Sequence, residues 1–254
     1  MTPNVAAAAV EDFRETFAAV RREVAKVVIG HQAAIETILV AFFAGGHALI
    51  EGVPGIGKTL IVRSLAEALN LSFNRIQFTV DLMPADITGT RIINEAPNGR
   101  RELVFVPGPV FAHVLLGDEI NRAPPKMLAR DAAPARVEEL RQLVRRVLVA
   151  PHIERYAADL VRLTHPGSDG EVPETVSRYV AYGASPRGGQ ALILGAKVLA
   201  LLAGRVHVAV EDIDRVAPAA LPHRLVINFA AEAASIHPPE IVAQVLAAGQ
   251  RRRG

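Results

Sequence analysis

The sequence contains no cysteine and no tryptophan, and aromatic residues in total make up only 5% of the chain. Without cysteine the chain has no disulfide framework and no cysteine-based metal site, and this composition fits a reducing compartment. The charges are nearly balanced, with a formal net charge of +2. A balance so close to zero gives no indication of nucleic-acid binding.

Long hydrophobic runs are also missing. Residues 37–50 form the longest uncharged apolar stretch, and Gly45, Gly46 and His47 interrupt it. A helix that spans a bilayer needs about 20 apolar residues, so this stretch is too short. Residues 1–10 contain no basic segment ahead of an apolar run. We therefore expect neither membrane insertion nor a secretory signal peptide, and the sequence predicts a cytoplasmic protein.

The hydrophobic residues, half of the chain, are spaced so that strands alternate with helices in the first half. This alternation is typical of an α/β protein with a parallel sheet. The second half is rich in alanine and leucine at helical spacing, and the composition changes near residues 130–136. We predict an α/β domain at residues 1–130 and an all-helical domain at residues 136–254. The expected helices are 11–28, 32–45, 58–69, 138–163, 186–203, 211–217 and 238–248; the expected strands are 47–51, 75–80 and 114–117; a hairpin is expected from 90–94 and 101–106.

A glycine-rich segment at residues 52–59 fits the pattern G-x-x-x-x-G-K-[ST] of a phosphate-binding loop. Its glycines let backbone N–H groups turn toward phosphate oxygens, and the following helix presents its positive N-terminus to the same anion. We expect Lys58 to reach the β- and γ-phosphates and the Thr59 hydroxyl to bind Mg²⁺. A chance glycine turn is the alternative, and the position between a predicted strand and a predicted helix disfavours it. The expected nucleotide-binding residues of the loop are Gly52, Pro54, Gly55, Ile56, Gly57, Lys58, Thr59 and Leu60.

Two adjacent carboxylates, Asp118 and Glu119, follow the apolar strand expected at residues 114–117. Alone they could be solvated acids at a strand end. Downstream of a phosphate-binding loop, they are typical of a metal ligand and a general base. We expect Asp118 to hold the Mg²⁺ shell and Glu119 to orient and deprotonate the attacking water.

Arg187 is expected to project from the first turn of a helix, because Ser185 suits its N-cap and Pro186 its first position. A cation there opposes the helix dipole, and binding an anion would compensate. A solvated arginine remains the alternative.

Several long motifs resemble the MoxR family of AAA+ ATPases. In the first half these are GHALIEGVPG at 46–55, RIQFT at 75–79, DLMPADITG at 81–89, PGPVF at 107–111 and DEINRAPPK at 118–126. In the second half, GASPR at 183–187 and HRL at 223–225 resemble the lid of that family. The motifs follow one another in the order of the family.

This resemblance implies a P-loop AAA+ domain, with an αβα parallel sheet, followed by a helical lid. It implies hexameric rings in which hydrolysis of ATP with Mg²⁺ drives remodelling or maturation of client proteins, together with partners that carry von Willebrand factor A domains. It makes Arg187 the sensor 2 arginine and places Ile29 and Gly30 near the adenine. It also implies that the hairpin at residues 90–106 faces the ring pore.

The chain departs from the family after Lys126. There the family has a strand with the sensor 1 asparagine and a helix with the arginine finger, whereas here residues 127–134 lead almost directly into the lid. The missing strand would lie between the strand before the phosphate loop and the strand ending at Asp118, so its loss leaves backbone groups unpaired unless those two strands close up. Two functions therefore stay open: an ATPase motor subunit, and a non-hydrolysing nucleotide-binding or adaptor protein. A P-loop kinase or GTPase is a third, more distant alternative.

Overall fold

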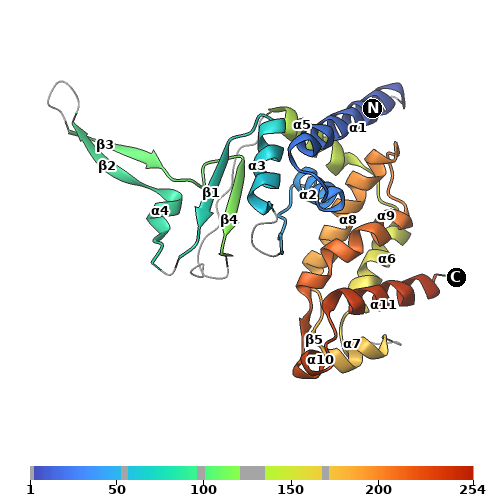
Figure 1. Cartoon of the computed structure of the whole chain (residues 1–254). Coiled ribbons are helices and arrows are strands. Elements are labelled where there is room, and N and C mark those ends of the chain that lie inside the picture. The colour runs from blue at the N-terminus through green and yellow to red at the C-terminus, as the bar shows by residue number, and fades with distance from the viewer. Residues whose placement is uncertain are drawn as a thin grey trace. The chain divides into compact units, whose positions relative to one another are not determined.

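The computed structural model describes residues 3–52, 57–79, 81–95, 101–120, 135–167 and 172–253 (Figure 1). Contacts divide the chain into two compact units. The first comprises Met1–Phe17, Glu36–Ala48 and Glu139–Gly254, and the second comprises Ala18–Ile35 and Leu49–Glu138. The two N-terminal helices thus contribute to both units, and the domain boundary near residues 130–136 stays a prediction.

The second unit contains a parallel pair of strands, β1 (Phe73–Gln77) and β4 (Val114–Asp118), in which Gln77 lies opposite Asp118. The helix α3 (Lys58–Ala68) packs against both strands, and its buried residues include Ile61 and Leu65. The continuous apolar sequence of β4 is typical of a strand covered on both faces, yet none of its five residues is buried. A sheet of only two strands leaves each strand with an open edge.

The strand expected at residues 47–51 does not form. A β-strand requires a neighbouring strand to satisfy its backbone N–H and C=O groups. Within the described residues, β1 and β4 pair only with each other, so residues 47–51 have no strand beside them. In the family, the missing strand would lie between residues 47–51 and β4. Here these two segments do not pair with each other.

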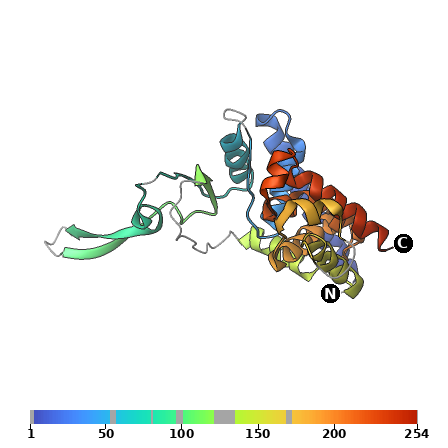
Figure 2. The same ribbon diagram turned by 90° about the horizontal axis from the view of Figure 1, so that it is seen from below.

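The predicted hairpin is confirmed, with β2 (Gly89–Glu95) and β3 (Arg101–Pro107) paired antiparallel. The short helix α4 (Pro84–Thr88) lies at its base, where Ile87 packs with Ile76 and Val110. Gly89 is required here, since a Cβ would come within 2.2 Å of the Val106 carbonyl oxygen. Figure 2 shows the two strands extending from α4 as a ribbon.

The first unit is mainly helical. Its core lies between α6 (Pro151–Arg162), α8 (Pro186–Leu202), α9 (Val210–Ala220) and α11 (Pro238–Arg251). Their fully buried side chains include Leu160, Leu192 and Ile213. The smaller elements are α7 (Glu174–Tyr179), the 3₁₀ turn η2 (Pro222–Arg224) and α10 (Phe229–Ala233).

Two short strands, β5 (Val180–Tyr182) and β6 (Val226–Ile227), pair antiparallel in this unit. The expectation of an all-helical second half is therefore wrong at these two places. The single helix expected at 138–163 is also two helices, α5 (Ala135–Arg146) and α6. Leu148 bridges to His207 between them, and Pro151 at the first position of α6 starts a new helix.

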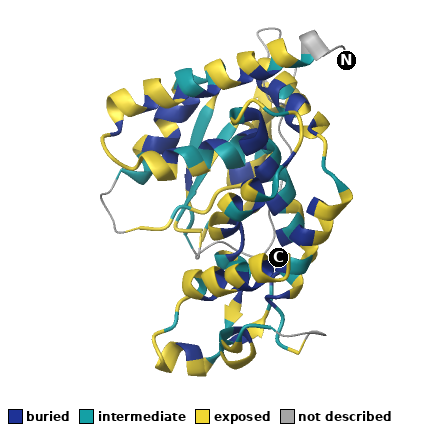
Figure 3. Ribbon diagram, turned by 90° about the vertical axis from the view of Figure 1, so that its right-hand side faces the viewer, coloured by how far each residue is buried: buried dark blue, intermediate teal, exposed yellow. Residues whose placement is uncertain are grey.

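The N-terminal helices are α1 (Pro3–Val27) and α2 (Gln32–Phe43). Exposed and buried residues alternate along α1 (Figure 3), as expected for an amphipathic helix. Phe13 and Phe43 meet edge to face, with ring centroids 5.2 Å apart. No helix in the described ranges is long and apolar enough to cross a lipid bilayer.

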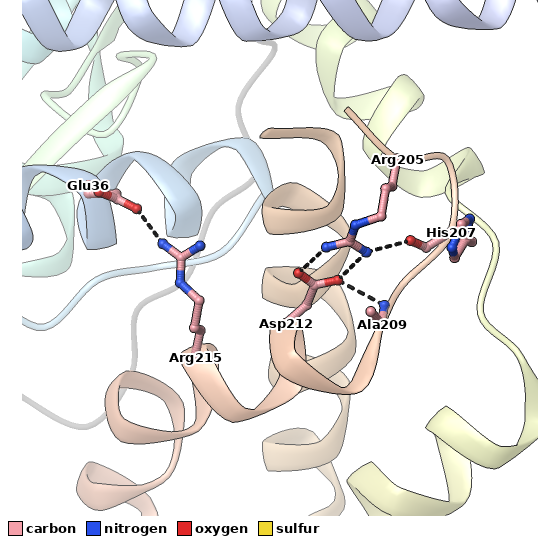
Figure 4. A network of polar contacts seen from close by, with 6 residues as sticks. All are labelled: Glu36, Arg205, His207, Ala209, Asp212 and Arg215. Atoms are coloured by element: carbon pink, nitrogen blue, oxygen red, sulfur yellow. Dashed lines mark hydrogen bonds and ion pairs between the residues drawn. The ribbon is translucent and has the colours of Figure 1, made fainter. Parts of the chain in front are cut away.

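A polar network ties α9 to the segment before it (Figure 4). The Arg205 guanidinium donates to both carboxylate oxygens of Asp212, at 2.7 and 2.8 Å. Asp212 also accepts from the backbone N–H of Ala209 at 2.8 Å, which caps the first turn of α9. Farther along α9, Arg215 pairs with Glu36 of α2 at 2.9 Å.

Candidate nucleotide-binding site

The helix α3 begins at Lys58, near the end of the glycine-rich segment at residues 52–59, as predicted. Gly57 holds the N-cap position with φ 84° and ψ 20°, a left-handed conformation that glycine adopts without steric cost. A Cβ at Gly57 would have room, with its nearest neighbour at 4.0 Å, so the backbone conformation is what calls for glycine here. The first turn, which includes Thr59 and Leu60, contains no acidic residue. Its unpaired N–H groups and the helix dipole therefore form an environment suited to an anion.

The side chain of Lys58 donates to the carbonyl oxygen of Gly52. This contact links the two ends of the glycine-rich segment. Pro54, Gly55 and Ile56, the other expected cradle residues, lie outside the described residues. The described residues of the expected phosphate-binding loop are Gly52 at its start and Gly57 to Leu60 at its end.

Asp118 is the last residue of β4 and takes part in two side-chain contacts. Its Oδ2 accepts from Arg75 Nη2 of β1 at 2.6 Å, and its Oδ1 accepts from the backbone N–H of Glu119 at 3.2 Å. The backbone N–H of Phe78 also donates to the Asp118 carbonyl oxygen at 2.9 Å, which extends the parallel ladder by one step. The end of the strand and its carboxylate are thus held from the neighbouring strand.

Glu119, the expected general base, has φ 54°. A residue with a Cβ is disfavoured in this left-handed region, and such strain is found preferentially at functional sites. The chain thus leaves the extended backbone of β4 directly after Asp118.

The expected phosphate and acid residues come together at one edge of the second unit. Because α3 packs on β1 and β4 and runs opposite to them, its N-terminus lies at the same edge as the carboxyl ends of the strands (Figure 1). Lys58 and Thr59 thus share this edge with Asp118 and Glu119. This is the arrangement that ligand sites of α/β sheets use.

Ile29 and Gly30 belong to the same unit, in the turn between α1 and α2. Gly30 has φ 81°, and Ile29 is 91% exposed. An exposed apolar side chain of this kind suits contact with a flat base, although no described contact links it to the loop. Arg187 belongs to the other compact unit, where it follows Ser185 and Pro186 at the start of α8 and is exposed.

The metal expected at this site is Mg²⁺, and the donors offered are the Thr59 hydroxyl and the Asp118 carboxylate. Both are hard oxygen ligands, and Mg²⁺ is commonly held by one or two protein oxygens together with phosphate and water. In the described parts of the chain, no group of three or more His, Asp and Glu residues forms a metal-binding cluster. The donor set therefore fits a magnesium ion that arrives with a nucleotide.

Arg75 is a residue of this site to which sequence reasoning assigned no role. In the sequence Arg75 belongs to the RIQFT motif at 75–79, and nothing in a single sequence shows that an arginine on one strand contacts an acid on another. Its contact depends on the pairing register, which places Arg75 opposite Leu116 and two residues from Asp118 on the same face.

The chain matches two known domain families. Residues 47–140 match the family described as ATPase family associated with various cellular activities (AAA), and residues 173–245 match the AAA lid domain. The chain is 32% identical to a protein named Chaperone MoxR1 of Mycobacterium tuberculosis over 301 positions, covering 88% of this chain and 79% of the relative. The chain belongs to the MoxR family of AAA+ ATPases.

Two further relatives extend along nearly the whole of this MoxR-family chain. It is 28% identical to the uncharacterized protein YeaC of Bacillus subtilis over 320 positions, covering 94% of this chain and 95% of the relative. A solved structure of a candidate ATPase from Cytophaga hutchinsonii superposes with a TM-score of 0.78 at 26% identity, covering 96% of this chain and 97% of that one. The predicted fold class, an AAA+ α/β domain with a helical lid, is confirmed.

The lengths of these alignments bear on the departure noted after Lys126. They run over 301 and 320 positions, whereas this MoxR-family chain has 254 residues in all. Each relative therefore contains several dozen residues that have no counterpart here. Membership of the family implies nucleotide binding and assembly into oligomers.

Proposed function

We propose that this chain binds MgATP between the start of α3 and the end of β4 and hydrolyses it, as a MoxR-type motor that remodels or matures partner proteins. In this proposal the loop backbone and Lys58 hold the phosphates. Thr59 and Asp118 hold Mg²⁺, and Glu119 orients and deprotonates the attacking water. Magnesium supplies charge neutralisation at the phosphates. Arg187 reaches the phosphates from the lid, and Ile29 and Gly30 border the adenine.

One observation carries the proposal: the start of α3 and the carboxylates that follow β4 share one edge of the same unit. An anion is stabilised at that helix N-terminus, and a cation beside that anion is stabilised by the carboxylate of Asp118. The two requirements of a metal–nucleotide complex therefore occur at one edge of the sheet. Neither group of residues would supply both requirements alone.

Calorimetric titration with ATP and Mg²⁺ tests binding. Lys58→Ala is expected to weaken binding by about 10- to 100-fold, because it removes a charged donor to phosphate. Lys26→Ala is the matched control, since Lys26 is exposed and pairs only locally with Glu23. Equal affinities of the Lys58→Ala and Lys26→Ala variants would rule out the proposed phosphate site.

Phosphate release tests turnover. Glu119→Gln is expected to keep its ATP affinity and to lower the rate by about 10²- to 10⁴-fold, because the amide cannot take the proton from water. Glu67→Gln, on the exposed face of α3, serves as the control. A Glu119→Gln variant that turns over as fast as the wild type would remove Glu119 from the proposed role.

A second function is favoured by a specific observation. Residues 47–51 have no strand beside them among the described residues, and the aligned relatives are longer than this chain. An arginine finger, which the family carries in the segment lacking here, is worth about 10³- to 10⁵-fold in rate. A non-hydrolysing nucleotide-binding or adaptor protein would bind ATP while the wild type and Glu119→Gln both released phosphate at background rate.

Assembly and partners form the remaining part of the proposal. We expect ATP to favour a hexameric ring, and we expect a protein with a von Willebrand factor A domain to bind that ring in the cytoplasm and present a client. Light scattering with and without MgATP measures the assembly. A mass that stays that of the 27.1 kDa monomer in saturating MgATP would contradict the ring.

A further inference from the structure

The strand β4 lies beside β1 (Figure 1) and uses only alternate residues to pair with it. The Val114 N–H donates to the Ser72 carbonyl oxygen at 3.0 Å, and the Asp118 carbonyl oxygen accepts from the Phe78 N–H at 2.9 Å. In a parallel pair, every second residue of a strand directs both of its backbone groups to the same neighbour. The N–H and C=O groups of Leu115, which follows Val114, therefore lie along the opposite edge of β4.

Gly117 lies two residues farther along β4 than Leu115, so its backbone groups face this open edge as well. Within the described residues, β4 pairs with no strand other than β1. Leu115 is 36% exposed and Gly117 is half-buried, so neither residue is enclosed. Unpaired backbone groups along an accessible edge are a template for another strand.

The outer edge of β1 is less suited to accept a strand. By the same alternation, its outward positions are Phe73, Arg75 and Gln77, of which Arg75 and Gln77 are exposed. Charged side chains on an edge strand hinder the addition of another strand. The outward positions of β4, Leu115 and Gly117, carry no charge. The two edges of this sheet therefore differ in chemistry, and the edge of β4 is the one open to pairing.

Another apolar segment of the same unit also has no strand beside it. Residues 47–51 have the composition of a strand but pair with none of the described strands. Leu49 is 59% exposed, and it belongs to the same compact unit as β4. The aligned relatives contain several dozen residues that have no counterpart here. This unit therefore offers strand-like backbone that the described strands of the chain do not cover.

We propose that the open edge of β4 binds an extended, apolar segment of another protein, which adds to the sheet as a strand beside β4. Backbone N–H and C=O groups in a row are satisfied by another backbone, so the ligand is a polypeptide in the extended conformation. Leu115 favours apolar side chains in that segment, because their contact removes apolar surface from water. Affinity comes from main-chain hydrogen bonds, so this surface accepts many apolar sequences.

A second copy of this chain is a poorer occupant of the edge. The strand β4 has five residues, so two such edges placed side by side share few hydrogen bonds and little side-chain area. A stable interface between two folded proteins buries about 1,200 Å² or more. A weakly and reversibly bound segment needs less area, and it brings no folded domain that has to fit around α3, which packs against β4. The inference goes beyond the proposed function, since strand addition requires no nucleotide.

Fluorescence anisotropy with the full chain tests the proposal, using a labelled peptide in which a Val-Leu-Val-Ile-Val run is flanked by lysines. Leu115→Pro is expected to weaken binding of this peptide by about tenfold or more, because proline removes the outward N–H and leaves the bonds of Val114 to β1. Leu115→Val keeps that N–H and an apolar side chain, so its affinity should stay within about twofold of the wild type. The same peptide with its central residues replaced by proline should not bind.

Hydrogen exchange of individual amides, followed by NMR, gives an independent readout. Addition of the peptide should slow exchange at the N–H groups of Leu115 and Gly117. Exchange at Leu116 should change little, because its N–H already pairs with β1. If Leu115→Pro does not fold, Leu115→Lys replaces it in the binding experiment, because it keeps the pairing with β1 and places a charge on the edge.

A wild-type protein that does not bind the peptide would overturn the proposal. Equal affinities of Leu115→Pro and Leu115→Val would overturn it too, because the peptide would then bind elsewhere. Exchange at Leu115 as slow as at Leu116 before the peptide is added would show that the chain itself covers this edge. A mass twice that of the 27.1 kDa chain, lost in Leu115→Pro, would assign the edge to a second copy instead.

Discussion

The guanidinium of Arg75 and the carboxylate of Asp118 form an ion pair of 2.6 Å between the two parallel strands, on the acid expected to hold magnesium. A metal ion and a guanidinium compete for the electrons of one carboxylate. The two side chains are 46% and 33% exposed, so the pair contributes at most about 1 kcal/mol. Arg75 is close enough to the site to modulate the affinity for the metal and too exposed to abolish it.

We therefore predict that Arg75→Gln raises the affinity of the ATP complex for Mg²⁺ by up to about fivefold. A titration of ATP binding against Mg²⁺ concentration measures this change. Arg63→Gln is the control, because Arg63 forms an exposed pair with Glu67 on α3. An unchanged or weaker dependence on Mg²⁺ would show that Arg75 does not compete with the metal.

Gly57→Ala is expected to weaken ATP binding by about tenfold. The left-handed backbone of Gly57 costs about 1–2 kcal/mol for a residue with a Cβ, and relief of that strain would move the start of α3. Gly45→Ala is a matched control, since Gly45 has φ 70° and open space around it. Both variants should lose similar stability in thermal melts, and only Gly57→Ala should lose affinity. Equal affinities would contradict a role for the loop conformation.

Asp212→Asn is expected to lower the free energy of unfolding of the helical unit by about 2–3 kcal/mol. Asp212 is 3% exposed and pairs with Arg205, so the amide leaves a partly buried guanidinium without its counter-charge. Urea unfolding followed by circular dichroism measures the loss. Asp159→Asn removes an exposed pair with Arg162 and should change stability by less than about 0.5 kcal/mol. Similar losses of unfolding free energy in Asp212→Asn and Asp159→Asn would show that burial does not strengthen the Arg205–Asp212 pair.

Tyr156→Phe is expected to lower stability by about 1 kcal/mol, since the Tyr156 hydroxyl donates to Asp214 at 2.5 Å and so links α6 to α9. Burial raises the pKa of Tyr156, and the bond to Asp214 raises it further. A raised pKa means that the stabilisation is present below the unfolded value of about 10 and is lost as the pH rises above it. Melting curves from pH 8 to 11 should thus fall more steeply for the wild type than for Tyr156→Phe. Tyr182→Phe, at an exposed position, should behave as the wild type does.

Local patterns predicted much of the structure because their causes lie within a few residues of each other. Pro186 at the first helical position marked the start of α8, and a turn sequence between two candidate strands marked the β2–β3 hairpin. The loop pattern marked the start of α3 at Lys58. Propensity and capping act over one or two turns of the chain, so a single sequence suffices to recognise them.

The predictions that were wrong depend on contacts between residues far apart in the chain. Residues 47–51 have the composition of a strand, yet a strand needs a partner, and none of the described strands lies beside them. The break before Pro151 is stabilised by Leu148 bridging to His207, which lies far along the sequence. The helical spacing of apolar residues continues across this break, so periodicity alone predicts one helix instead of two.

The sequence by itself determined which residues are able to bind a nucleotide, since the loop, Asp118 and Glu119 are recognised by residue type and spacing. Only the tertiary structure decided what holds those residues. The pairing of β1 with β4 brings Arg75 to Asp118. These contacts join residues far apart in the chain, and their energies depend on register and burial, which a linear pattern of residues does not contain.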